Sequence, residues 1–326
     1  MDPRTMRKAA THSLSVAPYS PRKLALIHTG VMVLVSMLLS VISFFLSRNI
    51  DSSTGLQGMD SRVAIGSFLS FLRLSSTILM PFWEIGFLYT ALRFAHTQDA
   101  EPTDLLQGFR RFGPVLRLTL LQLGLVLAVS MLCSFIGSTL FSFTPFMQDA
   151  AARIEAMPEL NTETASTFEL LRLIPEMRYM MVIFVIALLV IGLPMFYKFR
   201  LSNYVIMDDT RKAMVALRTS TRLTMGRRMK LFKLDLHFWW YYLAYVLVAV
   251  VSYGDTLLSA LGIALPVNPD VLFFGFLGIS ALMQLFLAWR FGAMVQTTYA
   301  HFYFHLKLNP AVAEPMTPTQ PTNPRN

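Results

Sequence analysis

The chain has 326 residues, of which 54% are hydrophobic and only 14% charged, and its mean hydropathy is +0.52. Soluble domains carry about 25% charged residues, so this composition excludes an ordinary soluble enzyme, and it equally excludes a chain that is disordered over most of its length. The single cysteine, Cys133, excludes an intramolecular disulfide and a cysteine-based metal centre. We therefore interpret the chain, with its net charge of +9, as an integral membrane protein rather than a nucleic-acid-binding protein.

Six apolar stretches are long enough to cross a bilayer, because a helix needs roughly 20 apolar residues to span about 30 Å of hydrocarbon. In chain order they are Leu24–Leu46, a span within Val63–Leu92, a span within Val115–Phe143, Tyr179–Tyr197, Leu236–Tyr253, and a stretch that begins near Val271 and continues past Trp289. The first is too long for a cleaved signal peptide and has no small-residue cleavage site after it. The sequence thus predicts an all-α, polytopic membrane protein with six transmembrane helices.

The distribution of Lys and Arg predicts the orientation of these helices, since cytoplasmic loops carry the excess of positive charge. The segments before span 1, between spans 2 and 3, between spans 4 and 5, and after span 6 hold 21 Lys and Arg residues, whereas the alternate loops hold 5. We therefore expect cytoplasmic N- and C-termini and a multi-pass protein of the plasma membrane.

The same reasoning divides the chain into three parts. Residues 1–23 form a basic cytoplasmic segment, residues 24–306 form the six-helix transmembrane domain, and residues 307–326 form a disordered cytoplasmic tail rich in proline. Within the domain, the outer loop 144–178 is acidic and contains six carboxylates. Its Ala, Glu and Leu content favours short surface helices outside the bilayer.

The segment between spans 4 and 5 is the most basic in the chain. A helix is expected over about 208–226, with Asp208 and Asp209 capping its N-terminus and Gly226 ending it. Its small-residue face is expected at Ala213, Leu217, Ser220 and Thr224, with arginines on the opposite stripe. Candidate residues for binding a lipid or a partner protein are Arg211, Arg218, Arg222, Arg227, Arg228, Lys230 and Lys233.

Two interpretations of this basic segment remain open. The charges can serve membrane topology alone, with Trp239, Trp240 and Tyr241 as an aromatic belt at the headgroup boundary. Alternatively, the segment binds anionic headgroups of the inner leaflet, each cation contributing about 1 kcal/mol near the surface, or it binds a membrane-protein partner. Nucleic-acid binding is not expected, because topology accounts for the charge.

Two runs in this region carry a family resemblance: Phe196-Tyr-Lys-Phe-Arg-Leu-Ser-Asn-Tyr-Val-Ile-Met-Asp-Asp209, and Ser220-x4-Met-Gly-x3-Lys-Leu-Phe-Lys-Leu-Asp-Leu-x-Phe238. Together with Asp104-Leu-Leu-Gln-Gly-Phe-Arg-Arg-Phe-Gly113, they resemble the bacterial multipass family catalogued as domain of unknown function 975. The resemblance covers roughly residues 24–305 and is strongest over 190–242. It implies an integral plasma-membrane protein and no established activity.

Charged residues inside the predicted spans are functional-site hypotheses, because burying a charge in hydrocarbon is costly. Glu84, Arg290 and Arg73 are the candidates. Arg73 is placed to reach the outer surface, and Arg290 lies near the inner interface. Glu84 is the deep carboxylate, and it follows Pro81, which can kink the span. Glu84 either acts in a transporter, as a proton or cation relay or a substrate contact, or it only fixes helix register as a neutral or Arg-paired glutamate, with Arg290 as the first candidate partner.

No catalytic constellation, metal site or cofactor motif stands out in the sequence. His301 and His305 are spaced i, i+4, but they lie in an aromatic stripe without an acidic or cysteine ligand nearby. We therefore expect a non-enzymatic accessory or scaffold component without a cofactor, which binds anionic lipid or a protein partner. The alternative is a small-molecule or ion transporter that uses Glu84 and Arg290.

Overall fold

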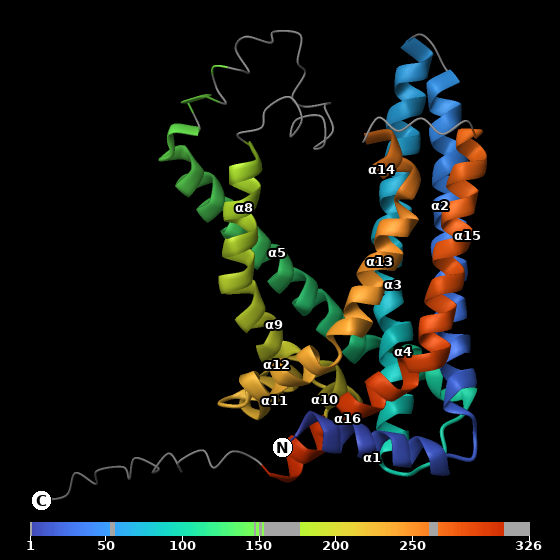
Figure 1. Cartoon of the computed structure of the whole chain (residues 1–326), viewed down its shortest axis with the longest axis vertical. Coiled ribbons are helices and arrows are strands. Elements are labelled where there is room, and N and C mark those ends of the chain that lie inside the picture. The colour runs from blue at the N-terminus through green and yellow to red at the C-terminus, as the bar shows by residue number, and fades with distance from the viewer. Residues whose placement is uncertain are drawn as a thin grey trace, which may run out of the picture.

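The computed structural model of the chain describes residues 2–52, 56–146, 148–149, 152, 177–260 and 267–309. All regular elements within these residues are helices, which confirms the predicted all-α architecture for this part of the chain. Long helices rise from a layer of shorter ones at one end of the molecule, and the N-terminus lies in that layer (Figure 1). Most of the predicted acidic loop 144–178, and residues 310–326 of the predicted tail, lie outside the described residues.

Within the described residues, five helices are long and apolar enough to cross a membrane. They are α2 (Pro21–Ser52), α3 (Leu56–Ala95), α5 (Phe112–Ser142), the run of α8 (Met177–Ala187), η2 (Leu188–Gly192) and α9 (Leu193–Phe199), and α15 (Pro269–Leu287) with its continuation. The predicted continuation past Trp289 is confirmed, because α15 passes through a π-helical turn, η3 (Ala288–Gly292), into α16 (Ala293–Leu308). The helix therefore reaches two residues into the predicted tail.

The predicted fifth span, Leu236–Tyr253, is not one straight helix. The chain bends by 64° between α12 (Arg228–His237) and α13 (Trp239–Ser252), so a sixth span is counted only if this bent pair crosses the membrane. The bend is at Phe238, whose side chain is fully buried. After a turn at Tyr253, α13 continues as α14 (Gly254–Ala260). The sequence missed the bend because neither Gly nor Pro marks it.

The apolar helices form two groups that separate away from the common layer (Figure 1). In the first group, α5 packs against α8 and η2. In the second group, α2 packs against α3 and α15, and α15 packs against α13. Large apolar side chains on these helices remain exposed, among them Phe135, Val190 and Val246. Such surfaces suit lipid contact, since lipid tails are as apolar as the side chains themselves.

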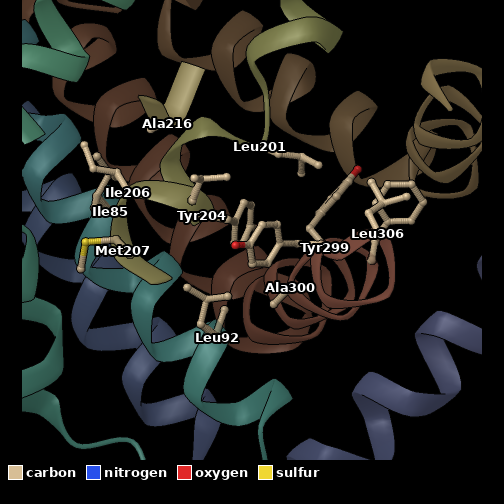
Figure 2. Packing of buried hydrophobic residues seen from close by; sticks show 14 of the residues in the cluster. Ile85, Leu92, Leu201, Tyr204, Ile206, Met207, Ala216, Tyr299, Ala300 and Leu306 are labelled. Carbon is tan, nitrogen blue, oxygen red and sulfur yellow. The ribbon is translucent and has the colours of Figure 1, made fainter. Parts of the chain in front are cut away.

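We call the short helices at the common end the basal layer. It comprises α1 (Pro3–Val16), η1 (Pro102–Leu106), α4 (Gln107–Arg110), α10 (Ser202–Asp208), α11 (Ala213–Thr224), α12 and α16. The main core lies here, where side chains from α3, α10, α11 and α16 converge (Figure 2). The helix α16 supplies much of it, because its buried residues include Tyr299, Ala300 and Tyr303. The basal layer, rather than the middle of the spans, is therefore the packed centre of the fold.

Two glycines allow η1 and α4 to lie directly against α3. A Cβ added to Gly86 of α3 would lie 1.8 Å from the carbonyl oxygen of Leu105, and one added to Gly108 of α4 would lie 1.9 Å from that of Phe82. These distances are far inside van der Waals contact, so only glycine fits at both positions. The segment between α3 and α5 is thereby held against α3. The contact of Gly108 is with Phe82, the residue that directly follows Pro81.

We predict that Gly86→Ala destabilises the protein by about 1–3 kcal/mol, because the backbones of α3 and η1 must separate to admit a methyl group. The measurement is the thermal unfolding midpoint of the purified chain in detergent. Gly124→Ala is the matched control, since nothing lies within 4 Å of a Cβ at that position of α5. Equal midpoints for the two variants would contradict the close packing.

Candidate functional site

A cluster of five polar side chains lies where α9, α12, α13 and α16 meet. We call it the Asp235 cluster; it consists of Tyr197, Arg200, Asp235, Tyr242 and Tyr299. Tyr197 donates a 2.6 Å hydrogen bond to Asp235 Oδ2. Arg200 forms an ion pair with the same oxygen, and Tyr299 donates to Asp235 Oδ1. The carboxylate of α12 therefore receives three donors from two other helical segments, α9 with its C-cap residue Arg200 and α16.

Further contacts enclose the ion pair. Arg200 Nη2 donates to the Tyr242 hydroxyl at 2.9 Å, and the hydroxyls of Tyr242 and Tyr299 are 2.7 Å apart. The guanidinium also lies over the ring of Tyr299, 4.6 Å from its centroid. The side chains of Arg200 and Asp235 are only 18% and 12% exposed. A charge so enclosed is stable only while it is paired and hydrogen-bonded, so the cluster ties α9, α12, α13 and α16 together.

The sequence analysis assigned no role to the Asp235 cluster, although it quoted three of its members. Tyr197 and Arg200 stand in the first run that carried the family resemblance, and Asp235 stands in the second. One usable signal was the opposite charge of Arg200 and Asp235 in two runs that both adjoin predicted spans. Tyr299 was grouped with an interfacial aromatic stripe, whereas its side chain is buried and its hydroxyl binds Asp235.

Asp208 and Asp209 do not cap the basic helix, which corrects the sequence prediction. Asp208 is the last residue of α10, and α11 begins only at Ala213. Lys307 binds both carboxylates, at 2.8 Å from Asp208 and 2.7 Å from Asp209, and Tyr303 donates to Asp208 at 2.9 Å. These contacts hold the end of α10 against α16. Because the partners are far apart in the sequence, local capping rules cannot predict them.

Two arginines, at the ends of α3 and α4, make contacts that connect segments of the basal layer. Arg93 forms an ion pair with Asp104 at 2.7 Å, and the same Asp104 oxygen accepts from the backbone N–H of Glu101 at 2.8 Å. Arg111 donates to the carbonyls of Ile206 and Met207, at the C-terminal end of α10. Arg93 and Arg111, which lie in the predicted basic segment between spans 2 and 3, therefore make structural contacts and are not free charges.

The basic helix α11 has the two faces that its sequence predicts. Ala213, Ala216, Ser220 and Thr224 are buried, and the Ser220 hydroxyl donates to the carbonyl of Lys198 at 3.0 Å. Ala216 replaces the expected Leu217, which is only half-buried. The helix ends before Gly226, whose φ of +69° suits glycine and confirms the predicted stop.

The seven candidate cations of this segment divide into two groups. Arg211, Arg218, Arg222, Lys230 and Lys233 are exposed, and none of them makes an ion pair within the described part of the chain. Arg227 and Arg228 are half-buried. Arg227 donates to the carbonyl of Asn309, and the Nε of Arg228 is buried without a hydrogen-bond partner. Only the first group forms an accessible basic surface.

The three predicted aromatic anchors have different environments. Trp239 is 58% exposed, as an interfacial anchor requires. Trp240 is half-buried against the ring of Phe291, at a centroid distance of 4.5 Å. Tyr241 is buried in the core and donates to the hydroxyl of Tyr245, so it is a packing residue and not an anchor.

The candidate charges within the spans are not brought together. Glu84 and Arg290 are both exposed on the protein, and no ion pair joins them among the residues that the structure describes. Arg290 instead lies over the ring of Phe291, 5.5 Å from its centroid. The hypothesis of a Glu84–Arg290 pair that maintains register is therefore wrong. The side chain of Arg73 lies outside the described residues.

The two histidines of α16 do not form a metal site with neighbouring ligands. His301 Nε2 lies 3.0 Å from the hydroxyl of Ser13 on α1, which ties α1 to α16. Within the described ranges, no group of three or more His, Cys, Asp or Glu side chains is arranged to hold a metal ion.

Comparison with known proteins finds one family whose model matches nearly the whole chain. The family is described as "Protein of unknown function (DUF975)", and the match covers residues 4–309. No curated protein and no solved structure matches. The match includes α1, which lies before the part of the chain covered by the resemblance in the sequence.

We predict that Asp235→Asn lowers the free energy of unfolding by about 3 kcal/mol or more, because it leaves the enclosed guanidinium of Arg200 without its counter-charge. Asp209→Asn is the matched control: its side chain is 43% exposed, and Lys307 keeps Asp208 as a partner. That variant should lose less than about 1 kcal/mol. The measurement is thermal unfolding in detergent, and equal losses would show that the Asp235 cluster does not stabilise the fold.

Proposed function

The chain belongs to the DUF975 family, and we propose that it is a non-enzymatic accessory or scaffold component of the plasma membrane. In this proposal the basal layer faces the cytoplasm, as the distribution of Lys and Arg predicts. The exposed cations of α11 and α12 bind anionic lipid headgroups of the inner leaflet or an acidic protein partner.

The observation that supports this proposal is that the carboxylates around α11 are bound by other cations, whereas the exposed cations of α11 are unpaired among the described residues. The carboxylates of α10 and α12, Asp208, Asp209 and Asp235, are all bound by Lys307 or Arg200. Both of these cations lie outside α11 and α12. No carboxylate of the segment is left to neutralise the exposed basic surface, and the surface must find its counter-charge outside this segment.

The energetics favour a membrane surface as that counter-charge. A cation near an anionic leaflet contributes about 1 kcal/mol, and the accessible basic surface contains Arg211, Arg218, Arg222, Lys230 and Lys233. Trp239 is exposed two residues after α12 ends, where an indole ring can lie at headgroup level. Because the attraction is electrostatic, it should weaken as ionic strength rises.

We predict that replacing Arg211, Arg218 and Arg222 together by Gln reduces the anionic lipid that co-purifies with the protein severalfold, because three unneutralised cations are lost. The same three positions changed to Lys form the control, since they keep the charge. The measurement is lipid analysis of protein extracted in a neutral detergent. If the Gln variant keeps its co-purifying lipid but loses cross-links to another protein, the surface binds a protein partner. If neither the lipid nor the cross-links change, the proposal is overturned.

The second candidate function is a small-molecule or ion transporter, and one observation favours it. Glu84 lies 11 residues from the end of α3, or about 16 Å at 1.5 Å per residue. It is exposed and has no ion-pair partner among the described residues. A carboxylate at that depth without an ion-pair partner is a functional-site hypothesis, because ionisable residues within spans are associated with ion pathways.

Proteoliposomes carrying a pH-sensitive dye separate the two functions. If the protein is an accessory component, the wild-type chain and Glu84→Gln will both lose an imposed pH gradient at the rate of empty liposomes. Asp99→Asn, in an exposed turn after α3, is the matched control. Faster loss with the wild-type chain that disappears only in Glu84→Gln would establish a relay and overturn the accessory function.

A further inference from the structure

A basic pocket of about 580 Å³ lies between α1 and α12, and none of the α11 residues lines it. Its lining consists of Arg4, Arg7, Lys8, Thr11, His12 and Ser15 of α1 and His237 of α12. A pocket of this size is within the range of small-molecule sites in proteins. The sequence predicts only a basic segment over residues 1–23, and the pocket arises because α1 packs against the basal layer.

The helix α1 presents these residues as a single stripe. Positions 4, 7, 8, 11, 12 and 15 recur every three or four residues, which is the spacing of one helix face. The opposite face contains Ala10 and Ser13, both buried, and Ser13 meets His301 of α16. The start of α1 is fixed by Pro3 in its first turn and by Asp2, whose side chain accepts from the Arg4 N–H. The basic stripe is thus held by a docked helix.

Charge in the pocket is positive and largely uncompensated. Arg4, Arg7 and Lys8 are exposed and make no ion pair among the described residues. Asp2 is the N-cap residue of α1, and its side chain accepts from the Arg4 N–H. Three cations without counter-charge on one helix face repel each other unless an anion lies between them.

His237 provides a second observation that points to a ligand. Its Nε2 atom is buried and has no hydrogen-bond partner. A buried polar atom without a partner costs about 1–3 kcal/mol, and a rotation of the ring that brings Nε2 to an oxygen acceptor in the pocket would remove this cost. The pocket therefore combines fixed positive charge with an unused ring nitrogen, which is the donor set that a phosphate group requires.

We propose that the pocket between α1 and α12 binds a phosphate ester, with Arg4, Arg7 and Lys8 neutralising its charge and His237 bonding one of its oxygens. The ester group belongs either to an anionic phospholipid headgroup or to a soluble phosphate compound. The foot of the apolar helix α2 begins five residues after α1 ends, so a lipid headgroup can reach the pocket. The site is separate from the α11 surface, and either can be correct without the other.

The test measures binding to the full-length chain in a neutral detergent at fixed ionic strength, by calorimetry. The probes are short-chain phosphatidylglycerol, short-chain phosphatidylcholine and inorganic phosphate. We expect phosphatidylglycerol to bind the wild-type chain at least tenfold more tightly than phosphatidylcholine, whose choline group the cations repel. Inorganic phosphate that binds as tightly as phosphatidylglycerol would support the pocket with a soluble ligand instead.

Two triple variants separate the pocket from the α11 surface. Arg4→Gln, Arg7→Gln and Lys8→Gln together should weaken the tightest probe at least tenfold, and severalfold more than Arg211→Gln, Arg218→Gln and Arg222→Gln together, which remove only the diffuse attraction of the α11 surface. All six side chains are exposed, so both variants should fold, and Arg7→Gln alone is the reserve variant. An unchanged Kd in the α1 variant overturns the pocket. Loss only in the α11 variant would also overturn it while leaving the proposed function intact.

Discussion

The ion pair between Arg200 and Asp235 is the contact on which the basal layer depends. It joins the end of a membrane-length helix to α12, immediately before the chain bends by 64° into α13. Tyr197 and Tyr299 complete the coordination of the carboxylate from α9 and α16. Because both side chains are so little exposed, neither charge can exchange its partner for water. The two charges are therefore satisfied only while the four helices keep this arrangement.

This requirement explains why the packed centre lies at one end of the molecule. Apolar helices in lipid have no hydrophobic driving force to associate, because the surrounding tails are equally apolar. In the proposed arrangement the basal layer lies outside the hydrocarbon, where burial of Tyr299, Tyr303 and Leu306 of α16 removes apolar surface from water. The glycine contacts of Gly86 and Gly108 add a close approach of backbones at the same end. The two groups of apolar helices separate only above this layer (Figure 1).

The allocation of charge links the fold to the proposed function. Acidic groups of the basal layer are engaged by a few cations that serve structure, such as Lys307, Arg93 and Arg200. Eight other cations form two distinct features, an exposed surface on and beside α11 and α12 (Arg211, Arg218, Arg222, Lys230 and Lys233) and a pocket beside α1 (Arg4, Arg7 and Lys8). A diffuse surface suits non-specific attraction to an anionic leaflet, whereas a pocket suits one phosphate group. In the two proposals, these features recognise the same class of anion independently of each other.

Composition and the lengths of apolar stretches by themselves determined the class of the protein, its helical architecture and the approximate position of most spans. Those properties follow from local rules, since a helix satisfies its own backbone and about 20 apolar residues match the bilayer. The faces of α11 and its stop at Gly226 were equally readable from spacing. Only the tertiary structure decided that Asp208 binds Lys307, that Glu84 and Arg290 stay apart, and that Asp235 meets Arg200. These pairings join residues 35 to 99 positions apart, and no local pattern specifies which distant charge completes a buried polar group.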